Sequence, residues 1–274
     1  MTKWKRSSES ILHSGSGCIT GGRYDRMDIS IVIIVKDGVK TMEKCLKALA
    51  AFDDVVVFDN GSTDGTQGIC RAFSNVNLVE GEFIGFGPTK RLASTYAKHD
   101  WILSLDSDEI VTNTFVNTLR SKSLDKDTVY SIKRVNYYKD IEIKHGWSND
   151  ILPRLYNRTK TNISEKMVHE GVVTDNMKVE YLNISLKHLR YTSISEFIIK
   201  ADRYSTLFAE QNVGKRDSSP LKAIGSSSFT FIRKYFFKLG FLDGYPGLIM
   251  AYSNMIENFY KYMKLYEKNE ELEK

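Results

Sequence analysis

The sequence predicts an α/β protein with a mostly parallel central sheet, helices on both faces of that sheet, and a C-terminal helical appendage. Short apolar runs alternate with segments of helical periodicity between residues 29 and 105, and this rhythm is typical of βαβ units. The 274 residues, of which 42% are hydrophobic, are also enough for one large domain with a full core. The fold class therefore follows from pattern and length together.

The first half of the chain supplies the parallel strands. ISIVIIV at residues 29–35 is a continuous β-branched run, which is typical of a strand buried on both faces. Further strands are expected at residues 55–58, 76–79 and from 101 onward, and helices at 42–49, 69–73 and 88–98. In such sheets, ligands bind beyond the carboxyl ends of the strands.

In the second half of the chain, apolar and polar residues alternate, which is typical of β-strands. This alternation occurs in the stretches VYSIKRVNYY, IEIKHGW, ILPRLYNR, MVHEGVV and VEYLNISLKHLRY. A helix is expected from Ser193, with Glu196 completing a capping box. A linker, GKRDSSPLKAIGSSS, then leads to a last segment that is rich in Phe, Tyr, Lys and Arg.

The chain is expected to divide into three parts. Residues 1–26 are rich in Ser and Gly and have no apolar core for a signal peptide, so they predict a disordered tail or an extension upstream of Met27. Residues 27–212 are expected to form the main α/β domain, and residues 213–274 the linker and a basic aromatic helical segment. That segment has no apolar run of about 20 residues, the length that spans a bilayer. It is expected either to lie in the headgroup region or to pack as a helix pair on the core.

The composition sets further limits. The three cysteines show no CxxC spacing, which predicts free buried thiols, a reducing compartment and no zinc site. The net charge of +5 is concentrated in the first 26 residues. The body of the chain is therefore close to neutral, and no nucleic-acid partner is expected.

Three carboxylates follow one strand in WILSLDSDE. Asp106 and Asp108 are two residues apart and face the same side of an extended backbone. Adjacent carboxylates repel unless a cation lies among them, and Mg²⁺ or Mn²⁺ bound to a diphosphate would supply it. A chance acidic cluster would give the same pattern. Glu109, one residue out of phase, is expected to point away toward structural contacts.

Two other polar clusters follow the first two strands. Lys36 and Asp37 end the first, and DNGSTDGT at residues 59–66 ends the second. In that loop the glycines permit tight turns, while Ser62 and Asp64 add hydrogen-bonding groups, and the following helix N-terminus favours anions. An ordinary strand-to-helix turn has a similar composition. One site is nevertheless expected to collect all three clusters.

Together, these motifs resemble those of a known enzyme family. DNGSTDGT, with ISIVIIVKDG before it and WILSLDSDE after it, resembles the family 2 inverting glycosyltransferases of the GT-A fold. The order FxGFGPTKRLA, WILSLDSDE, HGW, RLYNR, VHEGVV and GFLDGYPGLI is similar to the bacterial lipopolysaccharide core β-1,4-glucosyltransferase group. The resemblance runs from about Ile29 to Tyr266.

The resemblance implies a nucleotide-sugar site. Asp59 matches the acidic position that binds the uracil or ribose end of the nucleotide, with Lys36 and Asp37 close by. Lys90 and Arg91, in GPTKRLA, match basic positions near the nucleotide-sugar, although an exposed helix face would also explain such a pair.

The resemblance also implies a divalent cation, Mg²⁺ or Mn²⁺. Asp106 and Asp108 match the DxD motif, with Asp108 as the expected direct ligand. His169 is a candidate to complete the metal shell, and a structural histidine is the alternative.

An inverting transfer needs a base on the acceptor side, opposite the metal. Asp150 and Glu170 are the candidates, and each could instead be a surface carboxylate. Arg154 is expected either to pair with phosphate or to support the site.

The resulting prediction is an inverting transferase that adds a hexose, glucose from UDP-glucose, to a cell-surface glycolipid or polysaccharide. It is expected to be cytoplasmic and peripheral on the inner face of the membrane. A nucleotidyltransferase is the alternative, but the loop KDGVKTM after the first strand has one glycine and lacks a triphosphate clamp. A non-catalytic sugar-binding protein of the same fold is the third possibility. Oligomeric state is not predicted.

Overall fold

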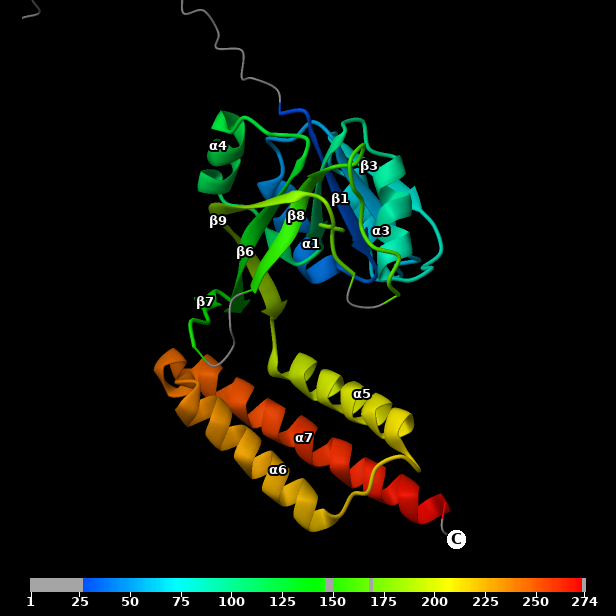
Figure 1. Cartoon of the computed structure of the whole chain (residues 1–274), viewed down its shortest axis with the longest axis vertical. Helices are drawn as coiled ribbons and strands as arrows, with labels where there is room; N and C mark the ends of the chain where they lie inside the picture. Colours follow the sequence, from blue (N-terminus) through cyan, green and yellow to red (C-terminus); the bar gives the residue numbers. More distant parts are fainter. Residues whose placement is uncertain (1–26, 146–149, 168–169, 273–274) are drawn as a thin grey trace, which may run out of the picture.

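The computed structural model describes residues 27–145, 150–167 and 170–272, and these form a sheet domain followed by a helical unit (Figure 1). The sheet domain ends with its last strand at Tyr191, and the helical unit begins at Ile194. The predicted N-terminal tail lies outside the described residues. The division expected at residue 212 stays a prediction, and the first helix of the helical unit, α5, ends there.

The first half of the sheet is parallel, as predicted. Its strands are β1 (Ile29–Val35), β2 (Val55–Asp59), β3 (Val76–Glu80) and β4 (Trp101–Asp106). β1 pairs with β2 and with β4, and β3 pairs with β2, all in parallel. The carboxyl ends of these strands therefore meet at one edge.

The second half of the sheet is mixed. Its strands are β5 (Glu109–Ile110), β6 (Thr128–Tyr138), β7 (Ile141–Glu142), β8 (Asp150–Asn157) and β9 (Lys178–Tyr191). The order is β3-β2-β1-β4-β8-β6-β9-β5, with β7 on β6. β8 is antiparallel to β4 and β6, while β9 is parallel to β6. The strand expected at MVHEGVV was wrong for the described residues, where Ile163 and Val172 form only an isolated bridge.

Helices cover both faces of the sheet, as predicted. They are α1 (Val39–Ala48), α2 (Thr66–Arg71), α3 (Phe86–Thr95) and α4 (Asn113–Ser121). Alternate residues of β1 face the helices on opposite sides of the sheet. Ile31 and Ile33 pack with the apolar residues of α1 and α4, whereas Val32 packs with Ala93 of α3 on the opposite face.

The helical unit contains three long helices and a short irregular turn (Figure 1). Its elements are α5 (Ile194–Asn212), α6 (Pro220–Ile232), the π-helix η1 (Arg233–Phe237), the 3₁₀-helix η2 (Gly240–Asp243) and α7 (Gly244–Leu272). α7 packs against both α5 and α6. The predicted linker was too long, because α6 already begins at Pro220. The Ser219 side chain caps this helix by accepting a hydrogen bond from the Lys222 backbone N–H. Within the described residues, no helix is both long and apolar enough to cross a membrane.

A small apolar cluster joins the two parts. Tyr138 and Tyr191, at the ends of β6 and β9, pack with Phe197 of α5 and Met250 of α7. Nearby, the Asp243 carboxylate accepts hydrogen bonds from the backbone N–H groups of Lys144 (3.0 Å) and His145 (2.8 Å). Through Asp243, the GFLDG segment (residues 240–244) thus binds the helical unit to the chain that leads toward β8.

Candidate active site

The loop after β2 is built around Asp59. Asp59 is fully buried, and its Oδ1 accepts hydrogen bonds from the backbone N–H groups of Gly61 (3.0 Å) and Ser62 (2.8 Å) and from Gln67 Nε2 (3.0 Å). Burial would raise the pKa of this carboxyl, but the hydrogen bonds lower it. Its second oxygen, Oδ2, has no hydrogen-bond partner among the described residues. Asp59 is therefore an ionised acceptor that holds the loop through Oδ1, while its buried Oδ2 is unpaired among these residues.

The loops after β1 and β2 are bound to each other. The Asp37 backbone N–H donates to Ser62 Oγ (2.8 Å), and the Thr63 N–H donates back to Asp37 Oδ1 (2.8 Å). Asp64 Oδ2 accepts from the Val39 N–H at the start of α1 (3.0 Å). Asp37 adopts the left-handed conformation with φ of 54°. Ser62 and Asp64 thus use their side chains to fix these loops.

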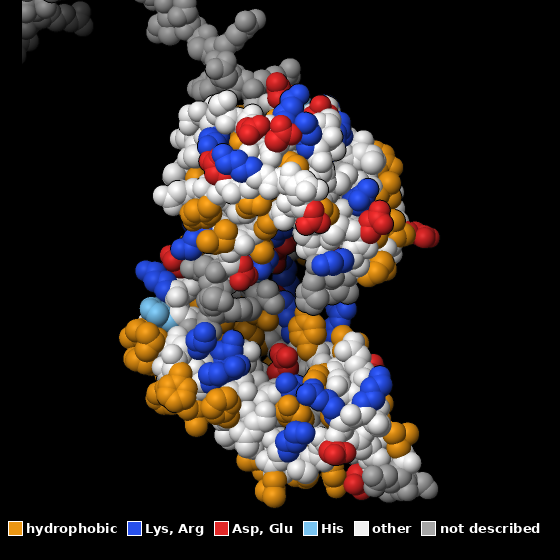
Figure 2. Space-filling view, viewed as in Figure 1, with side chains coloured by type: hydrophobic (Ala, Val, Ile, Leu, Met, Phe, Trp, Pro, Cys, Tyr) orange, Lys and Arg blue, Asp and Glu red, His pale blue; other side chains and the backbone are white. Residues whose placement is uncertain are grey.

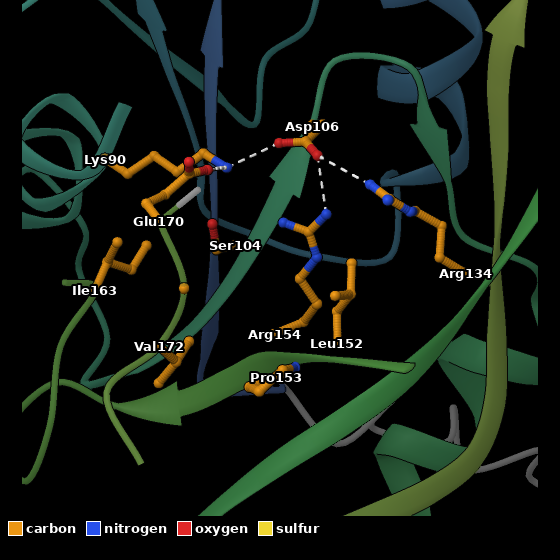
Figure 3. A pocket seen from close by; sticks show the side chains of 11 residues that line it. Lys90, Ser104, Asp106, Arg134, Leu152, Pro153, Arg154, Ile163, Glu170 and Val172 are labelled. Carbon is orange, nitrogen blue, oxygen red and sulfur yellow. Dashed lines mark hydrogen bonds and ion pairs between the residues drawn. The ribbon is translucent and has the colours of Figure 1, made fainter. Parts of the chain in front are cut away.

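Three cationic side chains surround the Asp106 carboxylate at the end of β4 (Figure 3). Lys90 Nζ is 2.8 Å from its Oδ1, Arg154 Nη2 is 2.8 Å from its Oδ2, and Arg134 Nη1 is 3.8 Å from the same oxygen. Burial would raise the pKa of Asp106, but the charges of Arg154 and Lys90 hold it well below its usual value. The same contacts keep Lys90 protonated, since its pKa is raised despite burial.

Glu109 belongs to the same cluster. Its side chain is fully buried and accepts a 2.5 Å hydrogen bond from Arg154 Nη2. It also accepts from the Asp106 backbone N–H at 3.0 Å. Glu109 therefore makes structural contacts, as expected, but it turns toward Asp106 rather than away from it. Arg154 supports both carboxylates from β8, the second of the two roles considered for it.

Asp108 faces a different partner. His188 Nε2, on β9, is 3.4 Å from Asp108 Oδ2, and His188 Nδ1 is 2.7 Å from Asn136 Oδ1. Because an amide oxygen only accepts, the contact with Asn136 places a proton on Nδ1, and Nε2 is the ring nitrogen that faces Asp108. No group of three or more His, Cys, Asp or Glu side chains with metal-binding geometry occurs in the described part of the chain. His169 lies outside it.

Both candidate bases are held by cations. Glu170 Oε1 is 2.8 Å from Lys90 Nζ, and its side chain is 17% exposed. Asp150 Oδ2 is 2.7 Å from Arg134 Nη2, and its side chain is 42% exposed. The two carboxylates thus approach Asp106 from different sides, one through Lys90 and the other through Arg134.

The GFG sequence at the start of α3 positions the segment that leads to Glu170. The backbone N–H groups of Phe86 and Gly87 donate to the carbonyls of Met167 and Lys166, both at 3.1 Å. A Cβ on Gly87 would lie 2.0 Å from the Ser164 carbonyl oxygen. Only glycine permits this close approach.

Arg91, next along α3 from Lys90, also contacts this segment. Its Nη1 is 3.5 Å from Glu165 Oε1 and 3.4 Å from the Ile163 carbonyl oxygen. Arg91 therefore contacts this segment on the protein surface, whereas the buried Lys90 contacts the carboxylates of Asp106 and Glu170.

Two cavities flank the DxD segment. The smaller, of about 360 Å³, contains the cluster in Figure 3. Its charged lining residues are Lys90, Asp106, Arg134, Arg154 and Glu170. The larger, of about 720 Å³, is lined by residues from both parts of the molecule, among them Lys36, Asp37, Asn60, Asp106, Asp108, Arg134, His188 and Arg203. Asp106 and Arg134 line both, so the cavities meet there.

Sequence reasoning missed Arg134, His188 and Arg203. One signal for His188 exists in the alternation of β9. Leu182, Ile184 and Leu186 are buried at every second position, and His188 is the next residue of that set. A polar side chain on an apolar strand face needs a partner. Arg134 carries no comparable signal, because its partners Glu109 and Asp150 come from other strands, and Arg203 is an exposed residue of α5 with no signal in its spacing.

Residues 30–177, more than half of the chain, match the family described as Glycosyl transferase family 2. The chain belongs to glycosyl transferase family 2. The match spans the loops after β1 and β2, the DxD segment and Glu170. Family membership and the sheet topology confirm the predicted GT-A fold class, and they favour the transferase prediction over a nucleotidyltransferase.

Relatives of this family 2 chain extend over nearly its whole length. It is 26% identical over 259 residues to the lipopolysaccharide core biosynthesis glycosyltransferase LpsC of Rhizobium meliloti (strain 1021), covering 89% of this chain and 94% of that protein. An uncharacterized glycosyltransferase of Rickettsia bellii (strain RML369-C) is also 26% identical, with 86% of this chain and 84% of that protein covered. Among solved structures, S. aureus TarS 1–349 in complex with UDP is similar at 14% identity and a TM-score of 0.43, covering 89% of this chain and 91% of that one.

Proposed function

We propose that this chain is an inverting hexosyltransferase that moves glucose from UDP-glucose to a cell-surface glycolipid, such as the lipopolysaccharide core or another surface polysaccharide. One observation carries the proposal: the two cavities meet at Asp106 and Arg134. A transferase must hold a donor and an acceptor in adjoining spaces, so that the anomeric carbon meets the acceptor hydroxyl where the spaces join.

We assign the nucleotide and diphosphate to the larger cavity. Lys36 and Asp37 line it at the end of β1, and Asp108 lines it at the end of β4. From the loop after β2, Asn60 lines the cavity, whereas Asp59 is buried beneath it and holds the loop through its hydrogen bonds to Gly61 and Ser62. Lys90 and Asp106 lie in the wall toward the smaller cavity, where the hexose hydroxyls would be hydrogen-bonded.

Asp108 and His188 are the residues that would hold a divalent cation. Mg²⁺ and Mn²⁺ favour carboxylate oxygens, and Mg²⁺ is usually bound by one or two carboxylates plus substrate phosphates. A histidine ring nitrogen is a common additional metal ligand. The hydrogen bond of His188 Nδ1 to Asn136 orients Nε2 for this role. Asp106 is instead occupied by Lys90 and Arg154. When bound, the cation neutralises charge on the departing diphosphate.

Glu170 is our first candidate for the base, and Asp150 is the second. Glu170 lines the smaller cavity, whereas Asp150 lines neither cavity. In the transfer step, the carboxylate takes the acceptor hydroxyl proton while the acceptor oxygen bonds to the anomeric carbon. The bond from that carbon to the diphosphate oxygen breaks on the opposite face, which inverts the configuration.

A lipid-linked acceptor is supported by the basic aromatic tip, which we define as residues 232–245. Its exposed apolar side chains are Ile232, Phe236, Phe237, Leu239, Phe241, Leu242 and Tyr245. Arg233, Lys234 and Lys238 are interleaved with them, and Figure 2 shows apolar and basic side chains together at this end of the helical unit. Such a surface suits an anionic headgroup region. We propose peripheral contact with the cytoplasmic face of the membrane, and similarity to LpsC supports a glycolipid acceptor.

The experiment that tests the transfer uses UDP-glucose, Mn²⁺ or Mg²⁺ and a glycolipid acceptor, with the anomeric configuration of the product read by NMR. The α-linked donor should give a β-linked product. Glu170→Gln should lose turnover by about 10²-fold or more while its affinity for UDP is kept. If Asp150→Asn shows that loss instead, Asp150 is the base. If neither does, or if the product is α-linked, the proposed mechanism is wrong.

A further inference from the structure

One wall of the larger cavity comes from outside the sheet domain. Arg203, on α5, lines this cavity together with Lys36, Asp108 and His188. Figure 2 shows a hollow between the sheet domain and the helical unit, with Lys and Arg side chains along it. The helical unit therefore contributes a cation to the space that we assign to the donor.

The orientation of α5 is fixed by a contact at its start. Glu196 Oε1 is 2.8 Å from Lys40 Nζ on α1, and its side chain is 22% exposed. Arg203 follows Glu196 by seven residues, or about two helical turns, so both lie on the same side of α5. Phe197 and Ala201 are buried on another side. The side of α5 that faces the β1 loop is thus the side that carries Arg203.

The charge of Arg203 is available to a ligand. Arg134, which lines the same cavity, is already paired with Asp150 and Glu109. Arg203 has no ion pair or hydrogen bond with any residue in the described ranges, and its side chain is exposed. A guanidinium group matches the oxygens of a phosphate through two parallel N–H donors, and this fit makes arginine a common phosphate ligand.

We propose that Arg203 binds the diphosphate of the donor, so that the helical unit completes the nucleotide-sugar site. The inference rests on the proposed function, because it takes the larger cavity as the donor site. Asp108 and His188, which would hold the cation, line the same cavity as Arg203, so all three would act on one diphosphate. It also adds to the charge stabilisation of the leaving group as the glycosidic bond of the donor breaks. A nucleoside, which lacks the diphosphate, gains nothing from Arg203.

The test is calorimetric binding of UDP and of uridine, each with Mn²⁺, to the full-length parent protein and to Arg203→Ala, Arg203→Gln and Arg203→Lys. Loss of one charge-assisted phosphate contact should weaken UDP binding about tenfold or more in the Ala and Gln variants. Uridine affinity should be unchanged, and Arg203→Lys should recover part of the loss. Lys215→Ala removes an exposed cation whose Nζ donates to the Gln211 carbonyl and which does not line the larger cavity, so it should bind UDP as the parent does.

The outcomes separate the two claims. Parent-like UDP affinity in Arg203→Ala and Arg203→Gln would overturn the role of Arg203 alone. An equal loss for UDP and uridine would also overturn it, because the effect would then not depend on the diphosphate. If the parent itself binds neither UDP nor another nucleoside diphosphate, the proposed function fails and this inference fails with it.

Discussion

Lys90 Nζ lies 2.8 Å from Asp106 Oδ1, and it lies at the same distance from Glu170 Oε1. A single buried ammonium group thereby joins the DxD segment, at the end of β4, to the candidate base beside it in the lining of the smaller cavity (Figure 3). The lysine side chain is 4% exposed, so water does little to screen these contacts. Lys90 therefore holds these two carboxylates together, while Arg154 and Arg134 contact the second oxygen of Asp106.

Replacing Lys90 by methionine should therefore damage both stability and activity. The change keeps most of the side-chain volume but leaves two carboxylates facing each other without their shared cation. Breaking such a buried pair costs about 3–5 kcal/mol. Urea unfolding should report this loss, and UDP-glucose turnover should fall with it.

Lys47→Met is the matched control for that change. Lys47 pairs with Glu43 on the surface, and both side chains are more than half exposed. The expected cost is below about 1 kcal/mol, with turnover unchanged. Equal effects of the two substitutions would contradict the role given to Lys90.

Much of the framework could be predicted from the sequence because it depends on local patterns. The β-branched run of β1 and the apolar periodicity of α1 identify their elements without tertiary information. The loop DNGSTDGT and the DxD segment could be placed at one edge, because parallel strands put their carboxyl ends together. The structure brings Lys36, Asp37, Asp106 and Asp108 to one cavity, whereas the loop at residues 59–66 contributes Asn60 to its lining and not Asp59, Ser62 or Asp64.

The partners of these residues could not be predicted, because long-range packing decides them. Arg154 looked equally suited to phosphate and to support, and its contacts with Asp106 and Glu109 come from strand pairing across the sheet. Arg203 reaches the site only because α5 folds back past α1. The linker prediction was wrong for a different reason: Ser and Gly in GSSS suggested a loop, but packing of α6 on α7 overrides weak helix propensity.

Gly87→Ala should displace the segment that leads to Glu170. The new Cβ would lie 2.0 Å from the Ser164 carbonyl oxygen and 2.7 Å from that of Lys166. We expect a loss of about 1–3 kcal/mol in the free energy of unfolding and a larger loss of turnover than of UDP affinity. Gly68→Ala is the control, since nothing lies within 4 Å of its added Cβ. A fully active Gly87→Ala would show that the tight contact is dispensable.

Glu196 should make the stability of the junction between the two parts depend on pH. Burial would raise the pKa of Glu196, but hydrogen bonds from Lys40 and Thr192 lower it below its ordinary value of 4.5. Since the folded state favours the ionised carboxyl, its stabilising effect is complete above about pH 4.5 and disappears as the pH falls through the lowered pKa. The parent should therefore exceed Glu196→Gln in unfolding free energy by about 1–2 kcal/mol at pH 7 and by little near pH 3. A gap that does not change with pH would contradict this assignment.

The basic aromatic tip should control membrane association. Phe236 and Phe237 are 52% and 73% exposed, and replacing both by serine removes exposed apolar area, together with the ring contacts of Phe236 to Phe231 and Tyr235. Sedimentation with phosphatidylglycerol vesicles should fall about tenfold or more, and salt should weaken the parent's binding. Tyr181→Ser, at an exposed site in β9, should bind vesicles as the parent does. Unchanged sedimentation of the double variant would remove the tip from the membrane contact.

The central claim is tested most directly by nucleotide release from a panel of UDP- and GDP-sugars, measured with Mn²⁺ or Mg²⁺ and with or without a glycolipid acceptor. We predict acceptor-dependent release of UDP, greatest with UDP-glucose, that is abolished by chelating the cation and reduced by about 10²-fold or more in Asp108→Asn. Release that needs no acceptor, or that Asp108→Asn leaves unchanged, would contradict the account.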